Sequence, residues 1–156
     1  MESLLVTNNF MSIILASAIG GILVAVYLAR QVLSAETGNK EMNEVAAAIN
    51  TGANAYLKRQ FTTIAPIVLL LTVFLYFTAG TSELAIGRAL AFLLGSIFSA
   101  SIGTVGMNIA TKTNVKVAQA AKKGFGEAME LAFKAGATTG MLTVGLGLLG
   151  ATLIYW

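Results

Sequence analysis

The chain has 156 residues, of which 56% are hydrophobic and only 11% are charged, whereas a soluble domain of this size usually has about a quarter charged residues. It contains no His, Cys or Asp, which excludes imidazole acid–base catalysis, thiolate chemistry and an aspartate-built magnesium site within this chain. The net charge of +3 would suit nucleic acid, but the positions of the basic residues favour another explanation.

Four uncharged apolar runs predict four transmembrane helices. A helix rises 1.5 Å per residue, so about 20 apolar residues cross a hydrocarbon core of roughly 30 Å. The runs cover residues 10–29, 61–79, 89–111 and 135–156. The first run has no basic segment before it and exceeds the roughly 7–15 apolar residues of a signal peptide. The sequence therefore predicts an all-α integral membrane protein, with the four helices forming part of a larger bundle.

The basic residues lie in alternate connecting segments. Segments 30–60 and 112–134 hold nine of the ten Lys and Arg residues, and the short link 80–88 holds only Arg88. The positive-inside rule puts these two long segments in the cytoplasm and the N-terminus outside. Because topology explains the basic charge, we expect the lipid bilayer and not nucleic acid as partner.

Small residues recur at intervals of four in three of the spans. They are Ala91, Gly95, Ser99 and Gly103; Ser17, Gly21, Ala25 and Ala29; and Gly136 and Gly140 followed by Thr143 and Gly147. Small residues let helix backbones approach closely in lipid. We expect these stripes to pack against neighbouring helices, the alternative being a substrate path.

Few polar residues lie within the spans. Apart from tyrosine no span holds an ionisable side chain, which argues against an ion path made by these helices alone. Asn108 is expected to bond to a neighbouring helix, with a cavity-lining role as the alternative. Pro66 is expected to kink its helix, with Thr62 and Thr63 satisfying the freed carbonyls. An aromatic belt is expected at the outer helix ends, formed by Tyr76, Tyr155 and Trp156.

The segment after Gly38 reads as a helix that runs on into the second span. Asn39 is a plausible N-cap, and Glu41 and Glu44 favour the positive end of the helix dipole. An apolar face at helical spacing is expected to pack on another cytoplasmic part of the same protein. Its residues are Met42, Val45, Ile49, Ala53 and Tyr56.

The second basic segment reads as an extension of the third helix, ended by Gly124 and Gly126. Its lysines can set the orientation of the protein in the membrane or bind phosphate, and the first role is expected. Glu127 and Glu130 share a helix face by spacing and are expected to be a solvated pair, not a metal site.

Three ordered segments carry a family resemblance. Residues 52–61 (Gly-Ala-Asn-Ala-Tyr-Leu-Lys-Arg-Gln-Phe) resemble the stretch before the second helix of membrane-bound, ion-pumping pyrophosphatases. Residues 106–121 resemble the pattern after the third helix, and residues 136–150 resemble the fourth helix. The likeness covers about residues 40–150. Lys116 stands where Arg is more usual, and Thr113 stands where a small residue is usual.

The resemblance implies a much longer protein, usually a homodimer. Such proteins hydrolyse Mg²⁺-bound pyrophosphate at the cytoplasmic side and move H⁺ or Na⁺ outward, and a K⁺ requirement stays open. We therefore expect an N-terminal fragment in a prokaryotic inner membrane, inactive alone and joined to the remainder of its own polypeptide. The catalytic, cofactor-binding and metal residues are expected outside this chain. The alternatives are a non-catalytic four-helix membrane subunit and, less favoured, a small transporter.

Overall fold

The computed structural model describes the backbone of residues 2–155 and the side chains of residues 10–155. Within that part the chain forms four helices: α1 (Glu2–Ser34), α2 (Lys40–Phe77), α3 (Ser82–Ala121) and α4 (Phe125–Tyr155). Each is long and apolar enough to cross a membrane. This confirms the all-helical class and the number of candidate spans. Trp156, one of the expected belt residues, lies outside the described residues.

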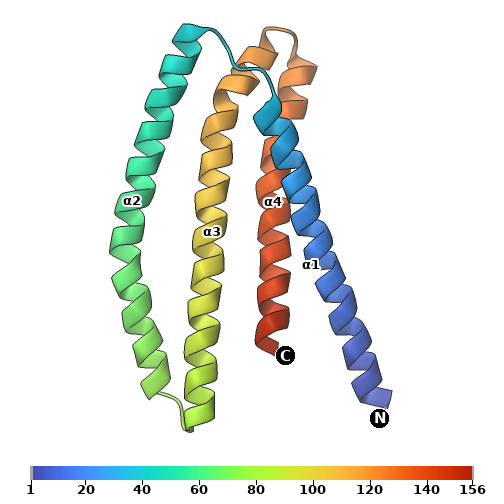
Figure 1. Ribbon diagram of the computed structural model, residues 1–156, viewed down its shortest axis with the longest axis vertical. Helices are drawn as coiled ribbons and strands as arrows, with labels where there is room; N and C mark the ends of the chain where they lie inside the picture. The colour runs from blue at the N-terminus through green and yellow to red at the C-terminus, as the bar shows by residue number, and fades with distance from the viewer. Residues whose placement is uncertain (1, 156) are drawn as a thin grey trace.

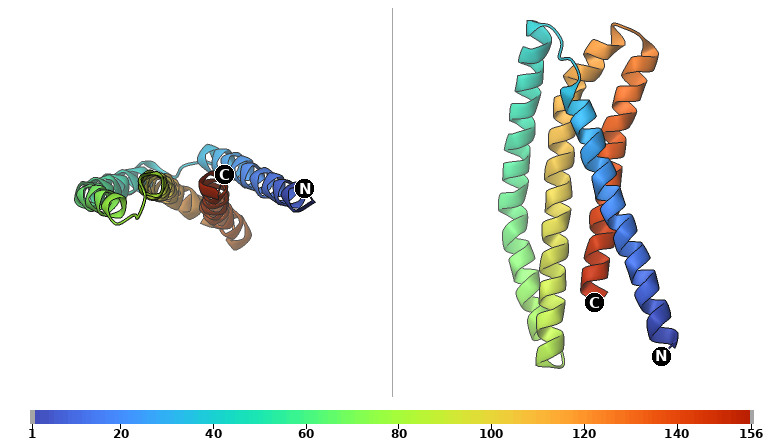
Figure 2. Two further views of the ribbon diagram at one scale, coloured as in Figure 1. Left: turned by 90° about the horizontal axis from the view of Figure 1, so that it is seen from below. Right: turned by 45° about the vertical axis from the view of Figure 1, so that its right-hand side comes forward.

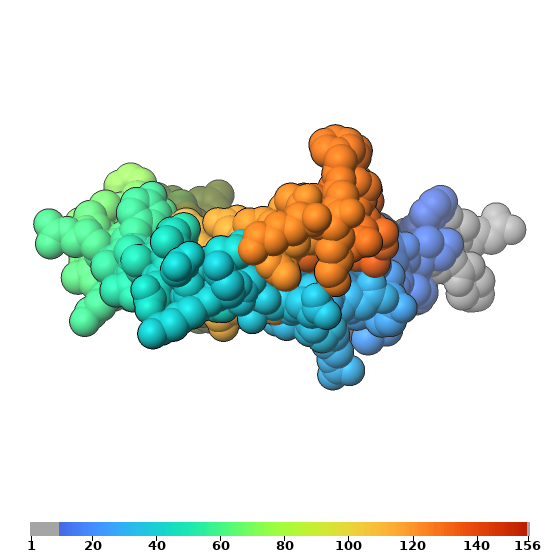
Figure 3. Space-filling view, turned by 90° about the horizontal axis from the view of Figure 1, so that it is seen from above, coloured from blue at the N-terminus to red at the C-terminus, as the bar shows by residue number. Residues whose placement is uncertain are grey.

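The helices form a single row in the order α2, α3, α4, α1 (Figures 1 and 2). In the described part α1 and α2 make no contact with each other, and α1 meets α3 only slightly. Seen from its upper end the molecule is long and narrow (Figure 3). Its exposed area is 10299 Å², compared with about 7,450 Å² for a compact soluble protein of this mass. One layer of apolar helices therefore leaves both broad faces uncovered.

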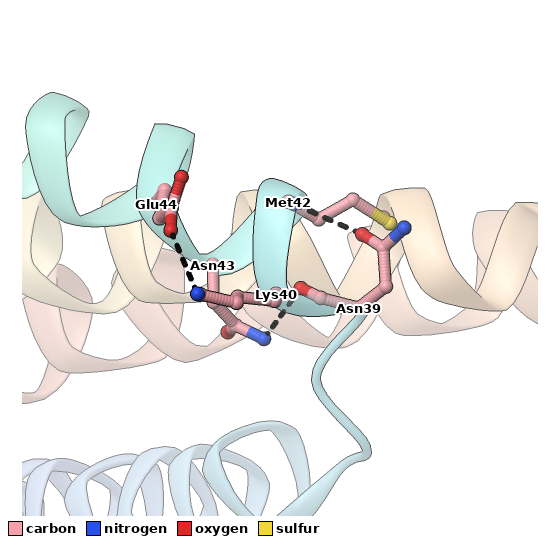
Figure 4. A network of polar contacts seen from close by, with 5 residues as sticks. All are labelled: Asn39, Lys40, Met42, Asn43 and Glu44. Atoms are coloured by element: carbon pink, nitrogen blue, oxygen red, sulfur yellow. Dashed lines mark hydrogen bonds and ion pairs between the residues drawn. The ribbon is translucent and has the colours of Figure 1, made fainter.

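The start of α2 is set by local polar contacts, as expected (Figure 4). The Asn39 side chain accepts a hydrogen bond from the Met42 backbone N–H at 3.0 Å. The Asn43 amide donates to the carbonyls of Gly38 at 2.7 Å and Asn39 at 2.9 Å. The first bond satisfies a backbone N–H that a helix start leaves without a partner, and the Asn43 bonds tie its side chain to the two residues that precede the helix.

The break between α3 and α4 is shorter than expected. Helix α3 ends at Ala121 and α4 begins at Phe125, so only residues 122–124 connect them. Gly124 is the one residue with positive φ, at +159°, in the described part. Gly126 lies inside α4, so the expectation that it helps to end the helix was wrong. One glycine in an extended conformation is enough to reverse the chain here.

The tightest helix contact is a seam of small residues between α1 and α4. Its buried members recur every seven residues, at Ala18, Ala25 and Val32 on α1 and at Thr138, Gly145 and Thr152 on α4. A seven-residue spacing keeps a nearly constant face toward the partner helix, as in a coiled coil. The buried threonines donate to backbone carbonyls one turn earlier in their own helix, so they leave no unpaired hydroxyl in the seam.

The four-residue stripes seen in the sequence differ in whether they contact another helix of this chain. On α1, Gly21 and Ala25 do lie at the seam with α4. On α4, all four stripe residues are exposed, as are Gly95, Ser99 and Gly103 on α3. In the described part these residues do not pack tightly on another helix of this chain, so their packing against a neighbouring helix stays a prediction. A four-residue step advances by about 40° around the helix each time, so such a stripe turns away from a straight neighbour.

Two expectations about polar groups in the spans are also corrected. Asn108 donates to the Thr104 carbonyl of its own helix at 2.9 Å, not to a neighbour. Pro66 has no N–H to bond the Thr62 carbonyl. The hydroxyls of Thr62 and Thr63 donate instead to the carbonyls of Lys58 and Arg59, about one turn earlier. Helix α2 nevertheless continues past Pro66 as one curved ribbon (Figure 1).

Candidate functional site at the basic end of the helix row

Both basic connections lie at the same end of the row. Residues 35–39 follow α1 and residues 122–124 follow α3, at the top of Figure 1, while the link 78–81 lies at the opposite end. A cavity of about 240 Å³ opens between the end of α1, the end of α3 and the start of α4. It is lined by Ala35, Glu36, Lys116, Gln119, Ala120, Lys123, Glu127, Glu130, Leu131 and Lys134. This is the strongest concentration of charged side chains in the described part.

Lys116 is the central contact of this end. Its side chain is only 8% exposed, and its ammonium group donates to the Leu33 carbonyl at 3.0 Å and the Ala35 carbonyl at 2.5 Å. The Leu33 carbonyl belongs to the last turn of α1 and Ala35 directly follows it, where helical partners are missing and the helix dipole is negative. Lys116 therefore caps α1 from α3, a role that its place in a basic stretch did not suggest.

Two further lysines are paired with carboxylates. The Lys123 ammonium lies 2.8 Å from a Glu36 carboxylate oxygen, and Lys134 lies 2.6 Å from Glu130. The hydrogen bond from Lys123, followed by its charge, lowers the pKa of Glu36, and the same contacts raise the pKa of Lys123. The Glu36–Lys123 pair joins the 35–39 connection to the 122–124 turn across the mouth of the cavity.

The cavity is therefore close to neutral, and its lysines are already occupied. Three lysines and three glutamates line it, so an anion would have to compete with existing pairs. The Gln119 side-chain oxygen is buried without a hydrogen-bond partner. The lysines that line this cavity therefore do not form an open phosphate site built from free cations. The geometry serves to hold three helices together.

The residues present do not fit a resident Mg²⁺ ion. In the described part no group of three or more carboxylate or other metal-ligating side chains comes together, whereas magnesium sites use convergent oxygen ligands. Of the two glutamates that share a helix face, Glu130 pairs with Lys134, and Glu127 lines the same cavity. That the catalytic, cofactor-binding and metal-binding residues lie outside this chain stays a prediction.

The comparisons with known proteins fall on nearly the whole chain. A family model described as inorganic H⁺ pyrophosphatase matches residues 19–156. A K(+)-insensitive pyrophosphate-energized proton pump of Chloroflexus aurantiacus is 46% identical across 91% of this chain and 21% of its own length. The pump of the same description from Methanosarcina mazei is 40% identical across 84% of this chain and 19% of its own length. The chain thus spans about a fifth of the length of these curated relatives.

Proposed function

The chain belongs to the inorganic H⁺ pyrophosphatase family, and from this we propose that it is part of a pump that couples pyrophosphate hydrolysis to H⁺ transport across a membrane. The observation that carries the proposal is the family match over residues 19–156. The 46% identity to a proton pump over most of the chain supports H⁺ as the transported ion. Four helices of membrane-spanning length agree with it.

Within such a pump this part has a scaffolding role. Lys116 caps α1, and Lys123 and Lys134 pair with glutamates, while the acidic residues do not converge on a metal site in the described part. We therefore assign binding of Mg²⁺ and pyrophosphate to other parts of the complete polypeptide. The four helices would supply a rigid wall beside those parts, held by the α1–α4 seam and the Lys116 cap.

The orientation follows from charge. The end with both basic connections is proposed to face the cytoplasm, and the N-terminus and the link 78–81 to face the other side. The relatives are named K(+)-insensitive pumps, which favours activity without K⁺ and gives no support to the K⁺ requirement left open above. A prokaryotic cell membrane and a homodimer remain part of the proposal.

The test uses inverted membrane vesicles that contain the complete polypeptide. Addition of Mg²⁺ and pyrophosphate should release phosphate and acidify the vesicle interior, and omission of K⁺ should change neither rate. An uncoupler should abolish the acidification and leave hydrolysis. Hydrolysis without acidification would contradict the pump, and absence of both would favour a non-catalytic membrane subunit. Tags at the N-terminus and between Lys112 and Lys134 test orientation, since only the second should react from the cytoplasm.

A further inference from the structure

Measured from the basic end of the row, Arg59 lies deeper than Arg30, Lys112 and Lys134, the basic residues that flank the other three spans at that end. Asn50 of α2 and Lys112 of α3 line the same small cavity, so they stand at the same level. Arg59 is nine residues further along α2, which places it about 13 Å deeper. In agreement, Phe61 lines a groove together with Gly103 of α3, well below Lys112.

Arg30 of α1, Lys112 of α3 and Lys134 of α4 share one level. The backbones of Gly21 and Gly145 approach each other closely. Arg30 is nine residues above the first glycine and Lys134 is eleven above the second, so the two differ in height by about 3 Å. Gly106 of α3 lies close to Thr139 of α4. Lys112 is six residues above Gly106 and Lys134 is five above Thr139, so Lys112 lies at that level too. A bilayer whose boundary follows these three helices therefore encloses Arg59.

Arg59 also points toward the free edge of the row. Leu57 is buried against α3, and Arg59 is two residues later, about 200° around the helix axis. Helix α2 is the end helix of the row and has only α3 beside it (Figure 2). The side of α2 that faces away from α3 is called its outer face here.

The outer face of α2 is a long apolar strip. Its large side chains include Val45, Ile49, Tyr56, Ile67, Leu70 and Phe74, and all of these are exposed. From the first to the last of these the strip measures about 44 Å. The hydrocarbon core of a bilayer is only about 30 Å thick, so acyl chains cannot cover the whole strip.

A cation at this depth needs an anionic partner. In the described part Arg59 forms no ion pair, and the nearest carboxylate further up α2, that of Glu44, belongs to a residue about 22 Å away along the axis. Arginine side chains can bend toward a membrane surface, but this covers only part of a depth of about 13 Å. Carboxylates match the guanidinium group in two parallel hydrogen bonds.

We propose that the outer face of α2 is covered by a helix from the remainder of the pump polypeptide, and that this helix brings a carboxylate to Arg59. The proposal rests on the proposed function, because the chain spans about a fifth of its relatives' length. An apolar strip longer than the hydrocarbon core and a cation within it together specify the occupant. It is an apolar helix with an acidic residue at the level of Arg59.

Photo-crosslinking in the complete polypeptide identifies the occupant. Benzoylphenylalanine replaces Tyr56 or Ile67 on the outer face, and Leu57, which faces α3, serves as the positive control. The outer-face probes should give crosslinked peptides that join α2 to a segment outside residues 1–156, while the control joins α2 to α3. Adducts with lipid alone, or with α2 of a second copy, would overturn the proposal. Crosslinks map the contact even if hydrolysis proves uncoupled from transport, so the two proposals can fail separately.

Substitution at Arg59 tests the ion pair. Arg59→Gln should shorten the half-life of the complete pump at elevated temperature by at least about tenfold, because it leaves a buried carboxylate unpaired. Arg59→Lys keeps the charge and should lie between that variant and the unchanged protein. The control, Lys40→Gln, removes an exposed charge at the start of the same helix, outside the enclosed stretch, and should change the half-life less than about twofold. Equal effects of the two glutamine substitutions would refute a partner on the outer face.

Discussion

The α1–α4 seam makes a sharp prediction at Gly145. A Cβ atom at this position would lie 2.7 Å from the Ile22 Cγ1 atom, 3.0 Å from the Ala18 carbonyl oxygen and 3.1 Å from the Ile22 nitrogen. Nonbonded carbon atoms prefer about 3.5–4.0 Å. The Ile22 side chain can rotate away, but the other two atoms belong to the backbone of α1. Gly145→Ala therefore has to push the two helices apart.

The expected cost follows from two opposing terms. Overpacking a tight contact costs about 1–3 kcal/mol, and replacing glycine by alanine within a helix returns up to about 1 kcal/mol. Gly147 is the matched control, because a Cβ there meets no atom within 4 Å. Gly147→Ala should gain the helix stability of alanine over glycine without a steric clash. The two variants should therefore differ in stability by about 1–3 kcal/mol, with Gly145→Ala the weaker.

Thermal inactivation of the complete pump in its membrane measures that difference. Samples are heated, and the temperature at which half of the pyrophosphate hydrolysis is lost is compared between the two variants. Gly147→Ala should equal or exceed the unchanged protein, whereas Gly145→Ala should be inactivated at a lower temperature. If the two variants are inactivated together, α1 and α4 do not pack through this glycine in the membrane, and the seam is wrong.

The polar contacts of the basic end give three further predictions. Lys116→Met should destabilise the pump by about 2 kcal/mol in the same thermal assay, because it removes a charged donor from the end of α1; Lys116→Arg should recover most of the loss. The difference in stability between the unchanged protein and Glu36→Gln should vanish as pH falls through the lowered pKa of Glu36. It should also vanish as pH rises through the raised pKa of Lys123. A difference that stays the same at every pH would contradict the Glu36–Lys123 pair. Asn39→Ala should speed amide exchange in the first turn of α2 by about fivefold, since a lost N-cap costs about 1 kcal/mol; an unchanged rate would argue against the cap.

The helices themselves could be predicted from local sequence. Long uncharged runs, and the Asn39 side chain before a helical pattern, determine where helices form through interactions over a few residues. The sequence resemblance also pointed to the family that the comparisons support. These features depend on neighbours along the chain, so the order of the amino acids is enough to predict them.

The choice of partners could not be predicted in the same way. Small residues cover several faces of each span, and the sequence offers both the exposed row through Gly136 and Gly140 and the buried one through Thr138 and Gly145. Only the angle between two helices decides which row meets a neighbour. The cap by Lys116 joins residues 81 and 83 positions apart, so no local pattern marks it among the other lysines.

The order of the row has a consequence for how the protein is made. Of the four helices α1 leaves the ribosome first, yet its main neighbour is α4, the last of them to be synthesised. Gly145 is 124 positions after Gly21, so at about 5–20 residues per second it emerges on the order of 6–25 seconds later. During that interval α2 and α3 can already pair as a hairpin. Until α4 is made, the small-residue face of α1 has no partner helix in the bilayer. Biogenesis factors can cover that face during this interval.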